Sequence, residues 1–368
     1  VTEILGEQQV NPAVLTSKLS LLFDQLHQVY LQADIDPALR KRQFISAHGL
    51  VIPPDYCITS QKDTLRVHAF IRGAHQAIGE LKNRYDECLH IVYPACGPFA
   101  PLLLPLIGYY KDSGLYDEND IRITLIDMQP GAVASLEAVV HEMGIAGYIE
   151  QILCGDGCDY QKSMPIHMVV LEAMQHGLSR EGHLPLARHF AAMIEPDGVF
   201  LPQQVSLRAV LSVGQKEFVE QWRDKERQDK RGQEDRGLCE ADMRQDINDQ
   251  RIDLGEILRL TPESLRTLKE RELDEYTRLI ECGTVTLPQA SQIPQNPLLL
   301  ICTQIKTYND EYINEYDSGI THPLPDMQVC VNFVPHDAKP GDLLVNSGDK
   351  LKFFYRLNGL PGFLAALG

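Results

Sequence analysis

Short apolar runs, each typical of a buried strand, recur between residues 89 and 202 and alternate with amphipathic stretches. The apolar runs cover residues 89–93, 121–126, 149–153, 168–171 and 199–202. Helical spacing of apolar residues fills intervals at about 102–111, 132–143 and 181–194. This alternation implies a parallel sheet with helices on both faces. The first half of the chain is therefore predicted to form an α/β domain.

The ends of these predicted strands carry the residues most suited to binding a ligand. In such sheets the ligand lies beyond the carboxyl ends of the strands, and here those ends carry Gly97, Asp127, Asp156 and Glu172. The first turn, residues 93–99, has Gly97 as its single glycine. A nicotinamide dinucleotide site needs further glycines beside the pyrophosphate, so this turn argues against that cofactor.

A polar loop with a glutamate at each end follows the fourth apolar run. Glu172 ends the run, and Glu181 opens the next amphipathic helix. Either glutamate alone could be a surface residue or one favoured by a helix N-terminus. The two together, on one loop that follows a buried strand, favour a functional role in binding a cationic group, such as the planar donor fork of a guanidinium.

The order of a strand, Glu172, a polar loop, Glu181, a helix and a turn at residues 196–198 resembles the double-glutamate loop of the protein arginine methyltransferases. That family belongs to the class I S-adenosylmethionine-dependent methyltransferases. The resemblance implies a Rossmann-like methyltransferase domain with S-adenosyl-L-methionine as its cofactor. It also implies that Glu172 and Glu181 bind and polarise the guanidinium.

The same resemblance implies roles for the residues at the other strand ends. Gly97 belongs to the turn beside the methionine moiety, Asp127 binds the ribose hydroxyls, and Asp156 meets the adenine amino group. The family usually has an acidic residue and three glycines in the first turn, whereas this chain keeps the central glycine alone. The resemblance is therefore weakest at this turn.

Two short motifs outside the sheet extend the resemblance. Lys62-Asp63-Thr64-Leu65-Arg66 matches a Lys-Asp-any-any-Arg run that precedes the cofactor domain in the family, which implies that Arg66 pairs with the cofactor carboxylate. The alternative is a solvated helix arginine. Residues 321–323 fall where the family has a Thr-His-Trp loop beside the active site, but the tryptophan is missing. His322 is thus expected to orient a carboxylate or relay a proton, or else to be a structural loop histidine.

Strand patterns dominate after residue 203 and predict a β-barrel or a sandwich. They cover residues 205–213, 284–287, 298–305, 328–334, 342–345 and 351–357. A charged segment at about 215–282 interrupts them, with apolar positions at Ile252, Leu254, Ile257, Leu258, Leu265 and Leu268. A barrel interrupted by a helical arm resembles the arginine methyltransferase architecture, in which the arm mediates dimerisation. The alternative is a solvated or partly disordered insert.

Composition narrows the class of protein further. The 368 residues have a net charge of -17, which argues against nucleic acid as a partner and slightly favours a cationic substrate. The most apolar segment, residues 101–110, is too short to span a membrane, and no signal peptide is visible. Nine scattered cysteines are typical of reduced thiols in a cytoplasmic protein. Cys154 and Cys158 lack two further ligands at suitable spacing, so no metal site is predicted.

Together these patterns predict a helical segment at residues 1–48, an S-adenosylmethionine-binding Rossmann-like domain at 49–204, and a β-barrel-like substrate domain at 205–368 with the arm at about 215–282. The predicted activity is N-methylation of a guanidinium group, by a homodimer. The guanidinium belongs to free arginine, a related small guanidine or a protein, and the sequence leaves these open, as it does mono- against dimethylation. Two alternatives are a methyltransferase of another small-molecule amine or hydroxyl and a methyltransferase-like scaffold without activity.

Overall fold

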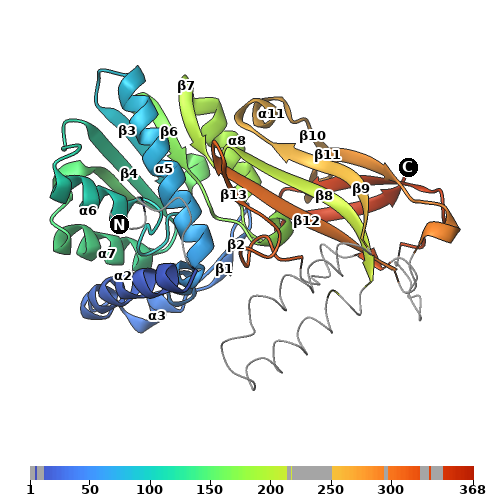
Figure 1. Ribbon diagram of the computed structural model, residues 1–368, viewed down its shortest axis with the longest axis horizontal. Helices are drawn as coiled ribbons and strands as arrows, with labels where there is room; N and C mark the ends of the chain where they lie inside the picture. The colour runs from blue at the N-terminus through green and yellow to red at the C-terminus, as the bar shows by residue number, and fades with distance from the viewer. Residues whose placement is uncertain are drawn as a thin grey trace.

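The computed structural model describes residue 5, residues 12–213, residue 217, and residues 251–293, 297–323, 331–332 and 343–368. Figure 1 shows a parallel sheet with its helices on one side of the molecule and the antiparallel strands on the other. Buried apolar side chains from both halves form one continuous core. The two halves are therefore packed on each other.

The N-terminal segment is mainly helical and ends in a short hairpin. Its elements are α2 (Pro12–Gln32), α3 (Pro37–Arg40), β1 (Phe44–Ile45), β2 (Leu50–Val51), α4 (Pro54–Cys57) and α5 (Thr64–Arg84). Helix α2 packs against α7 and α5. The hairpin of β1 and β2 spans the boundary predicted between residues 48 and 49, and the division into domains stays a prediction.

The predicted alternation of strands and helices is confirmed. Its elements are β3 (Leu89–Pro94), α6 (Leu104–Ser113), β4 (Ile121–Asp127), α7 (Pro130–Glu142), β5 (Ile149–Cys154), β6 (Ile166–Val170), α8 (His183–Met193) and β7 (Ile194–Leu201). The five strands pair in the order β5-β4-β3-β6-β7, and every pairing is parallel. The order reverses between β3 and β6, which places a ligand crevice beyond the ends of these central strands. This is a Rossmann-like sheet.

The second half forms two antiparallel sheets. Its elements are β8 (Gln204–Val213), β9 (Ile252–Leu260), α11 (Pro262–Thr267), β10 (Glu270–Asp274), β11 (Thr277–Thr286), β12 (Pro297–Tyr308), β13 (Glu311–Ile313), β14 (Val331–Asn332), β15 (Lys350–Arg356) and β16 (Gly362–Leu367). One sheet has the order β13-β12-β8-β9, with β14 also on β12, and the other has the order β10-β11-β15-β16. Closure of these sheets into a barrel stays a prediction.

The prediction of a helical arm over residues 215–282 is wrong for its second part, where β9, β10 and β11 lie with only the short α11 between them. Strand β9 pairs with β8, and the register shifts twice along this pair. Each shift interrupts the alternation of inward and outward side chains along the strand. Leu254, Ile257 and Leu258 are therefore spaced like apolar residues on one face of a helix. Most of the remaining part of the arm, residues 218–250, lies outside the described residues.

Three smaller differences concern the strand patterns. Residues 343–345 form no strand, although Val345 is buried and fills the core without pairing. The pattern predicted at 328–334 is described only at β14. Strands β13 and β16 were not predicted, since β13 is three residues long and β16 shows little alternation.

In the described part of the chain, the structure has no helix with the length and hydrophobicity to cross a bilayer.

Candidate active site

A cavity of about 160 Å³ opens at the carboxyl ends of β3, β4, β5 and β6. Residues from the N-terminal hairpin, α5 and the loop after β6 complete its wall. The wall includes six of the residues predicted from the sequence, namely Arg66, Gly97, Asp127, Asp156, Glu172 and Glu181. These residues come from five separate segments, and the strand order brings them together.

Asp127 ends β4 and holds the turn after β3. Its Oδ2 accepts a hydrogen bond from the Gly97 amide at 2.9 Å, and its Oδ1 accepts one from the Gln129 amide at 2.8 Å. Burial raises the pKa of Asp127 to about 6, against the effect of both hydrogen bonds. Each carboxylate oxygen keeps a further lone pair, so the side chain can still accept a hydrogen bond from a ligand.

The turn after β3 has two residues with positive φ, although it contains a single glycine. Gly97 has a φ of +66°, and Ala95 takes the left-handed region with a φ of +50°. A non-glycine residue in that region costs roughly 1 kcal/mol or more. The contacts around this turn therefore hold Ala95 in a conformation that glycine adopts more easily.

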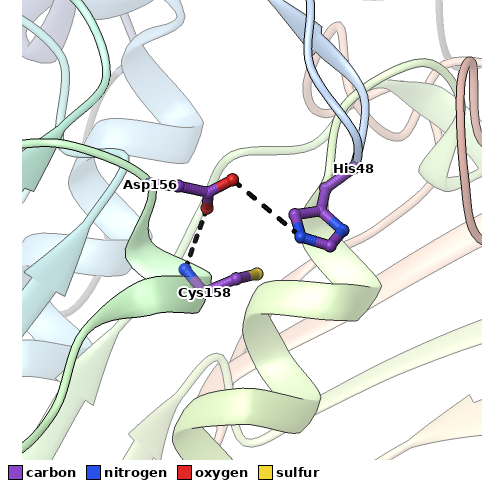
Figure 2. Close-up of side chains that lie close together, drawn as sticks. All are labelled: His48, Asp156 and Cys158. Atoms are coloured by element: carbon purple, nitrogen blue, oxygen red, sulfur yellow. Dashed lines mark hydrogen bonds and ion pairs between the residues drawn. The ribbon is translucent and has the colours of Figure 1, made fainter.

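Asp156 follows β5 and faces the N-terminal hairpin. Its Oδ1 accepts a hydrogen bond from the Cys158 amide at 2.9 Å, while its Oδ2 lies 3.9 Å from Nε2 of His48. Figure 2 shows His48 reaching from the hairpin toward Asp156 and Cys158. His48 also lines the cavity, although no sequence pattern predicts a role for it. No spacing rule connects it to a turn so far along the chain.

Glu172 follows β6 and is paired with Arg66 of α5. Arg66 donates from Nη1 to Glu172 Oε1 at 2.7 Å and from Nη2 to the Ser60 carbonyl at 2.6 Å. The two side chains are 8% and 17% exposed, so this ion pair is largely removed from water. Burial raises the pKa of Glu172 to about 7, because it outweighs the opposing effect of Arg66.

Glu181, at the other end of the loop, lies within the electrostatic reach of Glu172. Burial raises the pKa of Glu181 to about 7, and repulsion by Glu172 adds to the rise. A hydrogen bond from Gln175 and the charge of Arg66 act in the opposite direction. Two carboxyl groups in one cavity, each titrating near neutrality, form a pair suited to holding a cation or exchanging a proton.

The loop between the glutamates has a strained backbone. Leu178 and Arg180 both adopt positive φ, at +53° and +66°. Such conformations in residues other than glycine persist where the surroundings hold them in place, and they cluster at functional sites. The surroundings of this loop must therefore hold Leu178 and Arg180 in conformations that non-glycine residues rarely adopt.

Hydrogen bonds from both halves of the molecule hold the loop. Thr303 Oγ1 on β12 accepts a hydrogen bond from the Gly177 amide at 3.1 Å, and the Tyr355 hydroxyl on β15 donates to the Leu178 carbonyl at 2.6 Å. Arg180 donates its amide to the Pro361 carbonyl at 2.8 Å and accepts from the Leu50 amide at 2.7 Å. The antiparallel sheets and the N-terminal hairpin thus position the glutamates together.

A second missed residue, His183, lies in the first turn of α8. It is 2% exposed, and burial lowers its pKa to about 3 against a hydrogen bond to the Ala173 backbone. The neutral imidazole of His183 forms a hydrogen bond with the backbone of Ala173, which directly follows Glu172, and so supports the start of the loop. No sequence pattern indicates this role, because a histidine in an amphipathic helix has no distinctive spacing.

His322 is not one of the described residues that line the cavity. Its ring meets that of Tyr316 edge to face at 4.6 Å, and Tyr316 is not among those residues either. The same loop reaches the site indirectly, because Ser318 donates to Asp63 at 2.6 Å and Asp63 lies 3.7 Å from Nε of Arg66. A direct role for His322 at the glutamates stays a prediction.

The strand order and the cavity define a Rossmann-like α/β protein with two antiparallel sheets beside it. No protein-family profile matches the sequence, and no curated protein matches it. Among solved structures, the chain is similar to one from the Trypanosoma brucei PRMT1 enzyme-prozyme heterotetrameric complex with AdoHcy. The identity is 12%, the TM-score is 0.43, and the match covers 85% of this chain and 93% of that chain.

Proposed function

We propose that the protein is an S-adenosylmethionine-dependent N-methyltransferase that acts on a guanidinium group. The observation that carries this proposal is the position of Glu172 and Glu181 on the wall of the cavity that also holds Asp127 and Asp156. The strain at Leu178 and Arg180 supports a functional role for the loop between the glutamates. The sequence resemblance described above supports the choice of reaction.

The residues of the cavity fit the cofactor. Asp127 has lone pairs left that would accept the two ribose hydroxyls, and its hydrogen bond from the Gly97 amide holds the turn after β3 that would meet the methionine moiety. Arg66 offers a guanidinium to the cofactor carboxylate, and Asp156 offers a carboxylate to the adenine amino group. Bound S-adenosylmethionine supplies an electrophilic methyl group on a sulfonium.

The two glutamates bind and orient the acceptor. A guanidinium presents donors in a plane, and carboxylates at two of its edges fix that plane. Entry of the cation favours the charged form of both glutamates, whose pKa values lie near 7 without it. With the positive charge held at the bound nitrogens, the remaining nitrogen would be free to take the methyl group as the bond between that group and the sulfonium sulfur breaks and leaves S-adenosylhomocysteine, and proximity would supply most of the acceleration.

Glu181 is the residue that we assign to accept the proton released after transfer. Glu172 is fixed by its hydrogen bond to Arg66, so its charge is already compensated within the protein. Repulsion by Glu172 raises the proton affinity of Glu181. A carboxyl group with a pKa near 7 exchanges protons efficiently at neutral pH.

Calorimetry with S-adenosylhomocysteine tests the cofactor part of the proposal. We expect saturable binding at one site per chain. An absence of binding at millimolar ligand would leave only the methyltransferase-like scaffold. If the cofactor binds, an acceptor panel of free arginine, small guanidines, a Gly-Arg-rich peptide and simple amines separates a guanidinium acceptor from another amine.

We further propose a cytoplasmic homodimer, built through residues 218–250 of the arm predicted at about 215–282. Residues 252–286 form β9, α11, β10 and β11, so a deletion that tests the arm must spare them and remove residues 218–250 alone. Light scattering on the intact protein gives the simpler test. A mass near the 41.4 kDa of one chain would contradict the dimer.

A further inference from the structure

Three potential metal ligands of different chemistry converge at one edge of the cavity. His48 comes from the turn between β1 and β2, and Asp156 and Cys158 come from the turn after β5. One ligand atom from each residue lies within 4.8 Å of the others. Figure 2 shows the three side chains lying close together. They form a cluster of one nitrogen, one oxygen and one sulfur donor.

The spacing of these atoms suits a tetrahedral ion. Donors bound to tetrahedral zinc at about 2.0 to 2.3 Å lie roughly 3.3 to 3.8 Å from each other. Nε2 of His48 already lies 3.9 Å from Oδ2 of Asp156. The other oxygen of Asp156 accepts the Cys158 amide at 2.9 Å, which leaves Oδ2 for the ion. Closure of the cluster therefore needs only small side-chain movements.

The backbone presents His48 in a fixed position. The Ser46 hydroxyl accepts hydrogen bonds from the amides of His48 and Gly49 at 3.1 and 3.2 Å. A Cβ at Gly49 would meet the Arg180 carbonyl oxygen at 2.7 Å, so the hairpin lies directly on the glutamate loop. Within the part of the chain that the structure describes, Nδ1 of His48 has no hydrogen-bond partner, so Nε2 makes the polar contact of this ring.

The donor set selects the kind of ion. Thiolate and imidazole ligands favour zinc over magnesium or calcium, which prefer oxygen donors. A thiolate and a carboxylate together balance the two positive charges of the ion. Three protein ligands also leave the fourth position of a tetrahedral ion to water or to a ligand in the cavity.

We propose that His48, Asp156 and Cys158 bind one zinc ion. Binding releases the thiol proton of Cys158 to solvent and joins the hairpin to the end of β5. Because Leu50 of the same hairpin donates its amide to the Arg180 carbonyl at 2.7 Å, the ion would also steady the loop that carries Glu181. The binding itself requires neither a methyl donor nor an acceptor.

Metal titration of the whole chain under reducing conditions tests this proposal. Chelator-treated protein should take up one zinc ion per chain in competition with a chromophoric chelator. Cobalt, used in place of zinc, should give a thiolate charge-transfer band. Cys158→Ser should abolish this band and weaken zinc binding at least about 100-fold, since a ligand matters more than the outer groups whose loss costs 10- to 100-fold.

Cys154→Ser is the matched control, because Cys154 is an exposed cysteine near the same turn and lies outside the cluster. It should keep both the stoichiometry and the cobalt band. His48→Gln should weaken zinc binding as Cys158→Ser does, and it decides the outcome if the cysteine variant does not fold. Wild-type protein without stoichiometric zinc, or a band lost in Cys154→Ser and kept in Cys158→Ser, would overturn the proposal.

Discussion

The guanidinium of Arg66 lies 2.7 Å from Oε1 of Glu172, so one of the two glutamates holds a cation that belongs to the protein itself. Both side chains are largely buried. The attraction of two charges in such a place offsets the large cost of removing them from water only while both are present. This relationship makes Glu172 the fixed member of the pair and Glu181 the adjustable one.

Arg66→Leu should destabilise the fold in a pH-dependent way. At pH 8 the variant leaves an ionised Glu172 without its partner, at an expected cost of about 3 to 5 kcal/mol. At pH 6 Glu172 can take up a proton, because its pKa already lies near 7 and the loss of Arg66 raises it further. Denaturant unfolding at the two pH values measures the difference.

Arg72→Leu is the matched control for this test. Arg72 pairs with Glu311 at 2.9 Å, with side chains that are 16% and 20% exposed. It lies outside the residues that line the cavity. Its cost should be the same at pH 6 and pH 8, and an equal cost for Arg66→Leu at both values would contradict the assignment.

The contribution of Glu172 and Glu181 to stability should fall as pH rises from about 4.5 to about 7, whereas buried His183, with its pKa lowered from 6.5 to about 3, contributes in the opposite direction. The pKa values of Glu172 and Glu181 are raised from 4.5 to about 7 in the folded state. At these two groups the folded state therefore binds more protons than the unfolded state within this window, and their contribution decreases as those protons leave. Glu181→Gln removes one of these groups and leaves His183 in place, so its free energy of unfolding relative to the wild type should rise with pH across this window. An unchanged pH dependence of stability in that variant would mean that Glu181 is not one of the groups that titrate in this window.

Asp127→Ala should weaken cofactor binding more than it slows the chemical step. The substitution removes the acceptor for the Gly97 and Gln129 amides and also the proposed ribose contact. Saturating cofactor should then recover much of the rate. Calorimetry with S-adenosylhomocysteine gives the affinity, and an unchanged value would mean that the end of β4 does not bind the ribose.

Tyr355→Phe should lower kcat with little effect on cofactor affinity. The Tyr355 hydroxyl donates to the Leu178 carbonyl inside the strained loop, and loss of one such bond costs about 1 to 2 kcal/mol, or roughly 5- to 30-fold. Tyr308→Phe is the control, because that hydroxyl donates to Glu80 at 2.7 Å and Tyr308 does not line the cavity. A similar fall in kcat for both variants would indicate a general loss of stability.

The predictions from sequence succeeded where a local pattern decides the structure. The apolar runs before Gly97, Asp127, Asp156 and Glu172 are strands of one parallel sheet. Parallel pairing then places their carboxyl ends at a common edge, so the cavity residues follow from the strand order. The alternation of strands and helices along the chain therefore predicts where the cavity lies.

The predictions failed where pairing or distance along the chain decides the structure. The register shifts twice where β9 pairs with β8, and the apolar residues of β9 therefore have the spacing of residues on one face of a helix. His48 reaches Asp156 only because the hairpin folds onto the glutamate loop. The hydrogen bond from Tyr355 to Leu178 joins two segments far apart in the chain. The residue pattern of neither segment predicts this contact.

Methyl transfer by matched glutamate variants tests the central claim most directly. Wild-type protein, Glu172→Gln, Glu181→Gln and the exposed control Glu137→Gln are incubated with S-adenosylmethionine and the guanidinium acceptors, and products are read by mass spectrometry. The wild type and the control should add a methyl group to a guanidinium nitrogen. Both glutamine variants should lose about thirty- to several thousand-fold in turnover, and Glu181→Gln, which leaves the pair of Arg66 and Glu172 intact, should bind cofactor normally. Near-normal turnover in both variants on an acceptor that the wild type methylates would contradict the account.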